Sequence, residues 1–206
     1  MLKAKHNIFI YAFFRRYAIW KINRHFHSIK IIGEIGEKNR PVLVLSNHIS
    51  WWDGFWGMYL NVKILHRRFH FMMLEEQLRK YWFFNYTGGF SINKKSKSLL
   101  ESLDYTNELL SDNKNMVLMY PQGEIQSMHN RNFVFGKGLE RILKDRKQKI
   151  QIIFIAGIID YFSHQKPSVY LYFSEYKDPG YQLERIQSAY NAFYKQCIEK
   201  QLILTA

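Results

Sequence analysis

Residues 41–54 read PVLVLSNHISWWDG, an apolar run that ends directly before a histidine and an aspartate. The nearly continuous apolar run predicts a buried strand at 41–46, of the kind found in parallel sheets covered on both faces. His48 and Asp53 follow the carboxyl end of this strand. On one straight helix their side chains would point about 140° apart. We therefore expect a turn between them, with His48 in a loop and Asp53 in the first turn of the next helix.

The rest of the chain alternates short β-branched runs with helix-like stretches. We expect further strands at 30–36, 69–74, 88–93, 115–120, 149–159 and 167–176, and helices at 50–62, 75–84, 95–112, 138–146 and about 182–202. This alternation predicts a single α/β domain with a mostly parallel central sheet covered by helices. In such sheets the chemistry gathers in loops at the carboxyl ends of the strands.

Composition limits the classes of partner. The 206 residues carry a formal net charge of +13, and 47% are hydrophobic and 17% aromatic. Such an excess of positive charge attracts phosphate-bearing lipid, nucleic acid, acidic proteins or phosphorylated cofactors. Residues 1–40 hold nine Lys or Arg against Glu34 and Glu37, so much of the excess lies at the N-terminus.

The first 28 residues predict a basic, aromatic-rich amphipathic helix, followed by one larger domain at 29–206. Their uncharged stretch HNIFIYAFF is too short to span a bilayer, and no cleavage site follows, so we expect neither a transmembrane span nor a signal peptide. The helix suits two environments, the interface of an anionic membrane or the domain's own core. Cys197 is the single cysteine, so we expect no disulfide, no cysteine metal cluster and a reducing compartment.

A histidine beside a carboxylate is a candidate general base, because the carboxylate fixes the imidazole tautomer and stabilises the imidazolium. Alone, the spacing of His48 and Asp53 is a weak signal. Four further blocks follow it in order, each beside an expected strand or helix end: GGFSINKKS (88–96), YPQGE (120–124), FGKG (135–138) and IIFIAGI (152–158). Together these blocks resemble the glycerolipid acyltransferase superfamily, that is, the lysophosphatidic acid acyltransferases and their relatives, over roughly residues 40–160.

The resemblance implies transfer of a fatty acyl group from acyl-CoA or acyl carrier protein to a lipid acceptor, with no other cofactor and no metal. His48 would be the general base and Asp53 the residue that orients it, without an acyl-enzyme. The absence of a Gly-x-Ser-x-Gly motif agrees with this. Backbone N–H groups near Gly123, or at the start of the helix after His48, are the expected oxyanion donors.

Departures from the family's blocks bear on the acceptor. Lys94 stands at one usual arginine and Ile125 at another, while Gln122 replaces a glutamate and Glu124 a threonine. These changes lower the local positive charge, which disfavours a phosphomonoester, although Arg131, Lys95 or Lys137 are alternative cations. The acceptor classes left open are a lysophospholipid, a glycolipid, a glycosylated isoprenoid and an aminolipid. The substrate-binding residues expected beside the base are Asn47, Lys94, Gln122, Gly123, Glu124 and Lys137.

Other functions are also compatible with the sequence. Gln122 and Glu124 would on the simplest view only shape a turn. A non-catalytic relative that binds lipid fits the altered third block. A nucleic-acid-binding protein fits the charge, but no zinc, helix-turn-helix or RNP-like signature supports it. The partners we expect are a membrane lipid acceptor, an anionic membrane surface and an acyl carrier protein, with the protein peripheral or monotopic on the cytoplasmic face and without nucleic acid.

Overall fold

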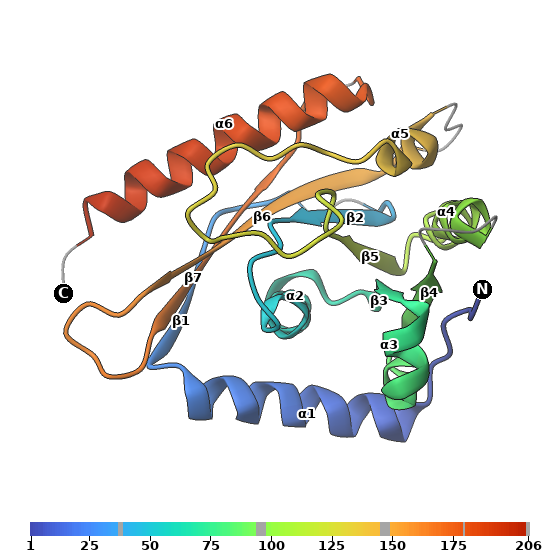
Figure 1. Ribbon diagram of the computed structural model, residues 1–206, viewed down its shortest axis with the longest axis horizontal. Helices are drawn as coiled ribbons and strands as arrows, with labels where there is room; N and C mark the ends of the chain where they lie inside the picture. The colour runs from blue at the N-terminus through green and yellow to red at the C-terminus, as the bar shows by residue number, and fades with distance from the viewer. Residues whose placement is uncertain (37–38, 94–97, 145–148, 179, 205–206) are drawn as a thin grey trace.

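A computed structural model describes residues 1–206 except 37–38, 94–97, 145–148, 179 and 205–206. It contains a seven-stranded sheet in the order β1-β7-β6-β2-β5-β3-β4, with helices on both faces (Figure 1). The strands are β1 (Ser28–Ile32), β2 (Val42–Ser46), β3 (Arg68–Leu74), β4 (Gly89–Ile92), β5 (Asn115–Met119), β6 (Gln151–Asp160) and β7 (Ser168–Glu175). The helices are α1 (Ile8–His25), α2 (Asp53–Leu60), α3 (Glu75–Lys80), α4 (Ser98–Leu109), α5 (Gly138–Leu143) and α6 (Leu183–Leu202), with a π-helical turn η1 (Asn61–Leu65) and a 3₁₀ helix η2 (Trp82–Tyr86).

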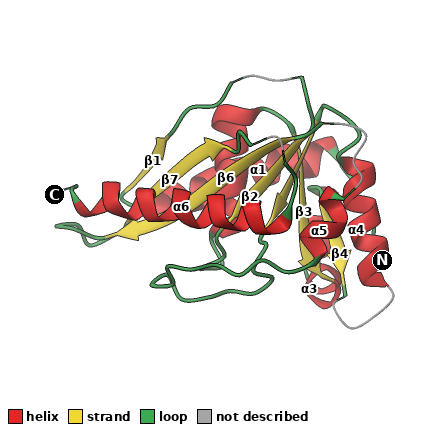
Figure 2. Ribbon diagram, turned by 90° about the horizontal axis from the view of Figure 1, so that it is seen from above, coloured by secondary structure: helices red, strands yellow, loops and turns green. Residues whose placement is uncertain are grey.

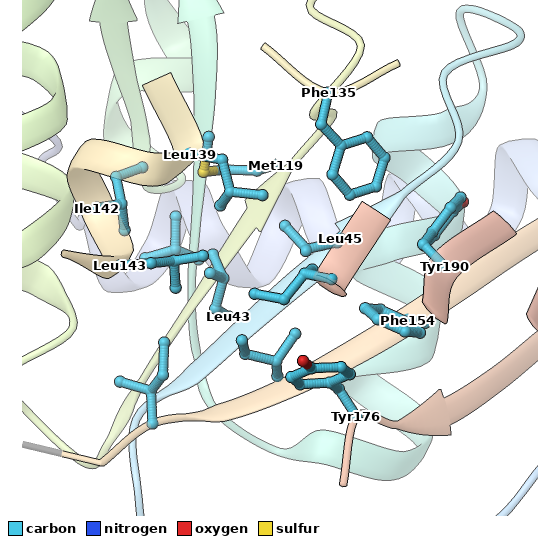
Figure 3. Packing of buried hydrophobic residues seen from close by; sticks show 14 of the residues in the cluster. Leu43, Leu45, Met119, Phe135, Leu139, Ile142, Leu143, Phe154, Tyr176 and Tyr190 are labelled. Atoms are coloured by element: carbon cyan, nitrogen blue, oxygen red, sulfur yellow. The ribbon is translucent and has the colours of Figure 1, made fainter. Parts of the chain in front are cut away.

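Neighbouring strands pair in parallel except β6 and β7, which are antiparallel. The prediction of a single α/β domain with a mostly parallel sheet is therefore confirmed. β2 shows why the sequence folds this way, because all five of its residues are buried. Leu43 and Leu45 pack with α4, α5 and α6 on one face, and Val42 and Val44 pack with α1 and α2 on the other. Figure 3 shows the first of these clusters, and Figure 2 shows α6 lying across the strands.

Several element boundaries differ from the expectation. The strand expected at 30–36 ends at Ile32, because Gly33 has a φ of 145° and lies so close to the Phe173 carbonyl that a Cβ there would clash. The helix expected at 50–62 starts at Asp53 and continues through η1. The Asn61 side chain then donates to the Arg67 carbonyl at 2.8 Å and accepts from the Arg67 N–H at 3.0 Å, which closes the chain around the end of that turn. The helix expected at 75–84 is split into α3 and η2.

The N-terminal helix is present as α1. Its N-cap Asn7 accepts hydrogen bonds from the N–H groups of Phe9 and Ile10, at 3.0 and 3.1 Å. One face of α1 buries an apolar row against the sheet and α2, while the opposite face leaves large aromatic side chains exposed. Among the described residues, no helix is both long enough and apolar enough to cross a membrane.

A contact between His6 and the buried His70 joins the N-terminal segment to the sheet. His6 Nε2 lies 3.1 Å from the Phe69 carbonyl, and its ring meets that of His70 at 4.8 Å, edge to face. His70 Nε2 lies 3.3 Å from Asn115 Oδ1, which accepts, whereas the buried Nδ1 has no partner among the described residues. Burial, with a smaller contribution from the charge of His6, lowers the pKa of His70 to about 4.

This pair predicts a loss of stability in acid. The unfolded chain takes up a proton as the pH falls through 6.5, whereas the folded protein resists until about pH 4, so stability present at neutral pH declines over this window. The gap between these values corresponds to on the order of 3 kcal/mol. Urea unfolding at pH 7 and pH 4.5 measures it. We expect His70→Leu to reduce the loss between the two pH values, and a substitution of the exposed His164 to leave it unchanged. Equal losses in wild type and His70→Leu would refute the assignment.

Candidate active site

His48 and Asp53 meet at the carboxyl end of β2. His48 lies in the loop after the strand and Asp53 is the first residue of α2. His48 Nδ1 donates to Asp53 Oδ2 at 2.6 Å. The turn inferred from the spacing is therefore present. Because the ionised carboxylate can only accept, the Nδ1 atom carries the proton and the Nε2 lone pair is left to accept another.

Asp53 is held by more than the histidine. Its Oδ2 also accepts from the backbone N–H groups of Ile49 and Ser50, at 2.7 and 3.0 Å, and its Oδ1 accepts from Ser50 Oγ at 2.9 Å. The carboxylate side chain is only 2% exposed, whereas that of His48 is 23% exposed. A fully bonded carboxylate thus fixes an imidazole that solvent and substrate can still reach. The contribution of Ser50 could not be predicted from the sequence pattern.

Asn47 anchors the loop to β6. Its Nδ2 donates to the Gly157 carbonyl at 2.9 Å, and its Oδ1 accepts from the Gly157 N–H at 2.9 Å. A Cβ on Gly157 would lie 3.1 Å from the Trp56 ring, so β6 and α2 can approach this closely because residue 157 is a glycine. The structure therefore gives Asn47 a role in fixing the start of the loop. The expected contact of Asn47 with substrate stays a prediction.

The third block lies against the first. Gln122, in the loop after β5, accepts from the His48 N–H through Oε1 at 2.7 Å, and its Nε2 donates to Gln126 Oε1 at 3.1 Å. The Gln126 N–H in turn donates to the His48 carbonyl at 2.9 Å. An amide at position 122 can accept and donate at once, which a carboxylate cannot do. This gives a physical reason for the glutamine that replaces the family's glutamate, because its side chain bonds to the backbone of His48.

The other expected site residues have different surroundings. Gly123 has a φ of 75° and its N–H donates to the Tyr120 carbonyl at 2.9 Å, so it makes a tight turn. Glu124 is exposed, and its Oε1 lies 3.5 Å from Gln126 Nε2. Lys137 is exposed just before α5, and the Gly136 N–H donates to the Pro121 carbonyl at 2.8 Å, which brings that segment beside the third block. Lys94 lies outside the described residues.

The expected oxyanion donors are partly engaged. The N–H of Gly123 serves the turn, and those of Ile49 and Ser50 serve Asp53. Donors for a developing oxyanion therefore have to come from other groups of these two segments. Cys197 lies on the buried face of α6, and burial raises its pKa to about 12, so its thiol stays protonated.

Two cavities touch the loop that carries His48, one at Ile49 and one at Trp52, although His48 itself lines neither. The first, of about 280 Å³, touches Ile49 and Gly157, and it is walled by apolar residues of β6 and α6 with Arg131 at its side. The second, of about 470 Å³, lies between the end of α1, Trp52 and the connection from β6 to β7. The two share Met128, Ile159 and Asp160. Together they form a largely apolar hollow along the loop that carries His48.

An α/β sheet with a partly exposed imidazole fixed by a buried carboxylate at a strand end defines a domain equipped for general-base chemistry. The sequence comparison is more specific. A family model described as Acyltransferase matches residues 28–156, which is more than half of the chain. The chain therefore belongs to this acyltransferase family, the glycerolipid acyltransferase superfamily, as the blocks predicted. Among curated proteins, none matches this sequence.

Proposed function

We propose that the protein moves a fatty acyl group from a thioester, acyl-CoA or acyl-ACP, to a hydroxyl or amine of a membrane lipid. The observation that carries the proposal is the His48–Asp53 pair, with Nδ1 bonded at 2.6 Å, in a chain that belongs to an acyltransferase family. His48 Nε2 takes the acceptor's proton as its oxygen or nitrogen attacks the thioester carbonyl. Asp53 stabilises the imidazolium that forms. The tetrahedral intermediate then expels the thiolate, which takes from Nε2 the proton that came from the acceptor, and no acyl-enzyme forms.

The apolar hollow supports a lipid-like substrate. Ile49 lines the first cavity and directly follows the base, so a chain held there would have its reactive end close to His48. Trp52, from the same loop, lines the second cavity. The tryptophans of this loop are then packing groups for an apolar chain. A basic protein suits both the phosphates of coenzyme A and an acidic carrier protein, and we propose both as donors.

Three residues of the third block support an acceptor without a phosphomonoester. Gln122 is engaged with the backbone of His48, Glu124 places a carboxylate at the exposed edge, and Ile125 is exposed where the family has an arginine. A glycolipid, a glycosylated isoprenoid or an aminolipid is thus the favoured class. A lysophospholipid is the second candidate, favoured by Arg131 in the wall of the first cavity.

The proposed acceptor class predicts a preference between acceptors that one substitution should shift. Wild type should use phosphate-free acceptors in preference to lysophosphatidic acid. Ile125→Arg restores the family's cation at an exposed site, and we expect it to raise kcat/KM for lysophosphatidic acid by about 10-fold, the value of one charge-assisted contact. The measurement is acyl transfer with each acceptor at matched concentration, with Val134→Arg as a control cation at another exposed position of the same β5–α5 connection. If lysophosphatidic acid is the best wild-type acceptor, the charge argument is wrong.

The outer face of α1 supports a peripheral position on an anionic membrane. Phe9, Phe13 and Trp20 are 81%, 71% and 53% exposed and lie within about 40° of one another around the helix. Arg16 and Arg24 lie on or beside the same face. Aromatic side chains flanked by arginines suit the boundary between headgroups and acyl chains. We place this face on the cytoplasmic leaflet.

Removing these aromatic residues is expected to release the protein from vesicles. Burying one large apolar side chain is worth roughly 1.5–3 kcal/mol, so Phe9→Ser with Phe13→Ser should weaken partitioning by 10-fold or more. Cosedimentation with vesicles of anionic and of zwitterionic lipid measures this. Val134→Ser removes an exposed apolar residue from a loop on the other side of the sheet and serves as the control. Binding that is unchanged in the double variant would exclude α1 as the membrane contact.

A further inference from the structure

The ring of Tyr120 lies flat against the imidazole of His48. The two ring centroids are 4.1 Å apart and the planes differ by 12°. Tyr120 directly follows β5, and Met119 of β5 pairs with Leu45 of β2. The sheet therefore holds in register Met119, which directly precedes Tyr120, and Leu45, which lies three residues before His48. The stack is a consequence of two neighbouring strands ending at the same level.

The hydroxyl of Tyr120 does not explain the placement of this residue. The oxygen is buried and has no hydrogen-bond partner among the described residues. Burial, followed by the negative charge of Asp53, raises the pKa of Tyr120 well above its usual value of 10, so the phenol stays protonated. A buried, neutral phenol cannot exchange protons with substrate. A buried hydroxyl without a partner also costs stability, so the contribution of this residue has to come from its ring.

The ring of Tyr120 restricts an orientation of the His48 imidazole that the hydrogen bonds leave free. Gln122 and Gln126 fix the backbone of His48, and Asp53 holds one ring nitrogen. With one hydrogen bond at Nδ1, the imidazole can still rotate about the axis of that hydrogen bond. An aromatic face at 4.1 Å blocks this rotation on one side. The same face attracts a cation, so it favours the imidazolium that forms when the base takes a proton.

We propose that Tyr120 is a positioning residue for the general base, which acts through its aromatic face and not through its hydroxyl. The inference rests on the proposed function of His48. Asp53 from α2 and Tyr120 from the end of β5 are the titratable groups in contact with the imidazole. Among the described residues, the charged or titratable groups around the adjoining cavity are His129 and Arg131 of the following loop, Asp160 of β6 and Tyr194 of α6.

The test compares Tyr120→Phe with Tyr120→Leu. We expect Tyr120→Phe to keep kcat within about 2-fold of wild type and to melt at the same temperature or higher, because only an unpartnered hydroxyl is lost. Tyr120→Leu should lower kcat by about 10-fold with KM nearly unchanged, the rough value of a desolvated ring–cation contact. The acid limb of its pH–rate profile should move to lower pH, because an imidazolium without the ring loses its proton more readily. Tyr120→Met replaces leucine if that variant does not fold.

Two results would overturn the proposal. One is a kcat for Tyr120→Leu within 2-fold of wild type. The other is an equal loss in Tyr120→Phe and Tyr120→Leu, which would assign the role to the hydroxyl. An NMR titration of the His48 imidazole separates this inference from the proposed function, since it needs no substrate. The apparent pKa of His48 should be lower in Tyr120→Leu than in wild type and Tyr120→Phe, even if the wild-type protein acylates nothing; no difference would refute the inference.

Discussion

Replacing His48 with alanine is expected to lower kcat by on the order of 100- to 10,000-fold, the usual contribution of a positioned general base. The acceptor would then have to attack the thioester without losing its proton to the enzyme. KM for the donor should change little, because the His48 side chain lines neither of the two cavities. Release of free thiol from acyl-CoA in the presence of lipid acceptor measures the rate.

The matched control is His164→Ala, an exposed histidine in the connection between β6 and β7. This variant should keep the wild-type rate. His48 is partly exposed and makes one side-chain hydrogen bond, so His48→Ala should also lose no more than about 1 kcal/mol of unfolding free energy. A kcat within 10-fold of wild type would show that His48 is not the base.

Asp53→Ala is expected to damage both stability and rate. The carboxylate accepts four hydrogen bonds, from His48, from Ser50 Oγ and from the N–H groups of Ile49 and Ser50. Its removal leaves partly buried donors without an acceptor, so the free energy of unfolding should fall by roughly 2–4 kcal/mol. The imidazole also loses its orientation and the charge that stabilises its cation. We therefore expect kcat to fall by about 100-fold or more.

Asp53→Asn separates these two effects. The amide oxygen can still accept from the backbone N–H groups, so most of the stability should return, whereas the negative charge is lost. Its kcat should remain at least about 10-fold below wild type. Urea unfolding and initial rates on the same preparations measure both quantities. Full activity in Asp53→Asn would mean that the charge of Asp53 does not stabilise an imidazolium.

Local patterns were enough to predict the mostly parallel sheet and the contact between His48 and Asp53. The run at 41–46 is apolar on both sides of the strand, and it became β2 with one row of side chains in each core. The turn from His48 to Asp53 follows from the helical period alone, since a straight helix separates the two. The matching residues of the family, 28–156, include the expected 40–160 almost entirely.

Contacts between distant residues lay beyond the sequence pattern. Gln122 and His48 are 74 residues apart, and Asn47 and Gly157 are 110 apart. No local propensity reports which backbone group such an amide will bond. The stack of Tyr120 on His48 depends in the same way on the register of β2 with β5. Gln122 was expected to contact substrate, and only the folded chain shows its side chain bonded to the backbone of the base.

The two-sided character of α1 illustrates a different limit. The sequence suited a membrane interface and the domain's own core equally well. In the structure Phe14, Ala18 and Ile22 pack inward, while Phe9 and Phe13 remain outside. Both environments are therefore compatible with one helix. A helix that is apolar on opposite sides has no single hydrophobic stripe from which its orientation can be read.

We propose that this protein acylates a lipid by general-base catalysis at His48 without a covalent intermediate. The most direct test of this proposal incubates the wild type and His48→Ala with acyl-CoA or acyl-ACP and a total lipid extract, followed by mass spectrometry of the lipids and of the intact protein. We predict a lipid that gains the mass of the acyl group with wild type and not with His48→Ala, and no acyl adduct on either protein. Identical lipid products from both proteins would show that His48 is not the general base. An acylated wild-type protein on the reaction path would show that a covalent intermediate forms.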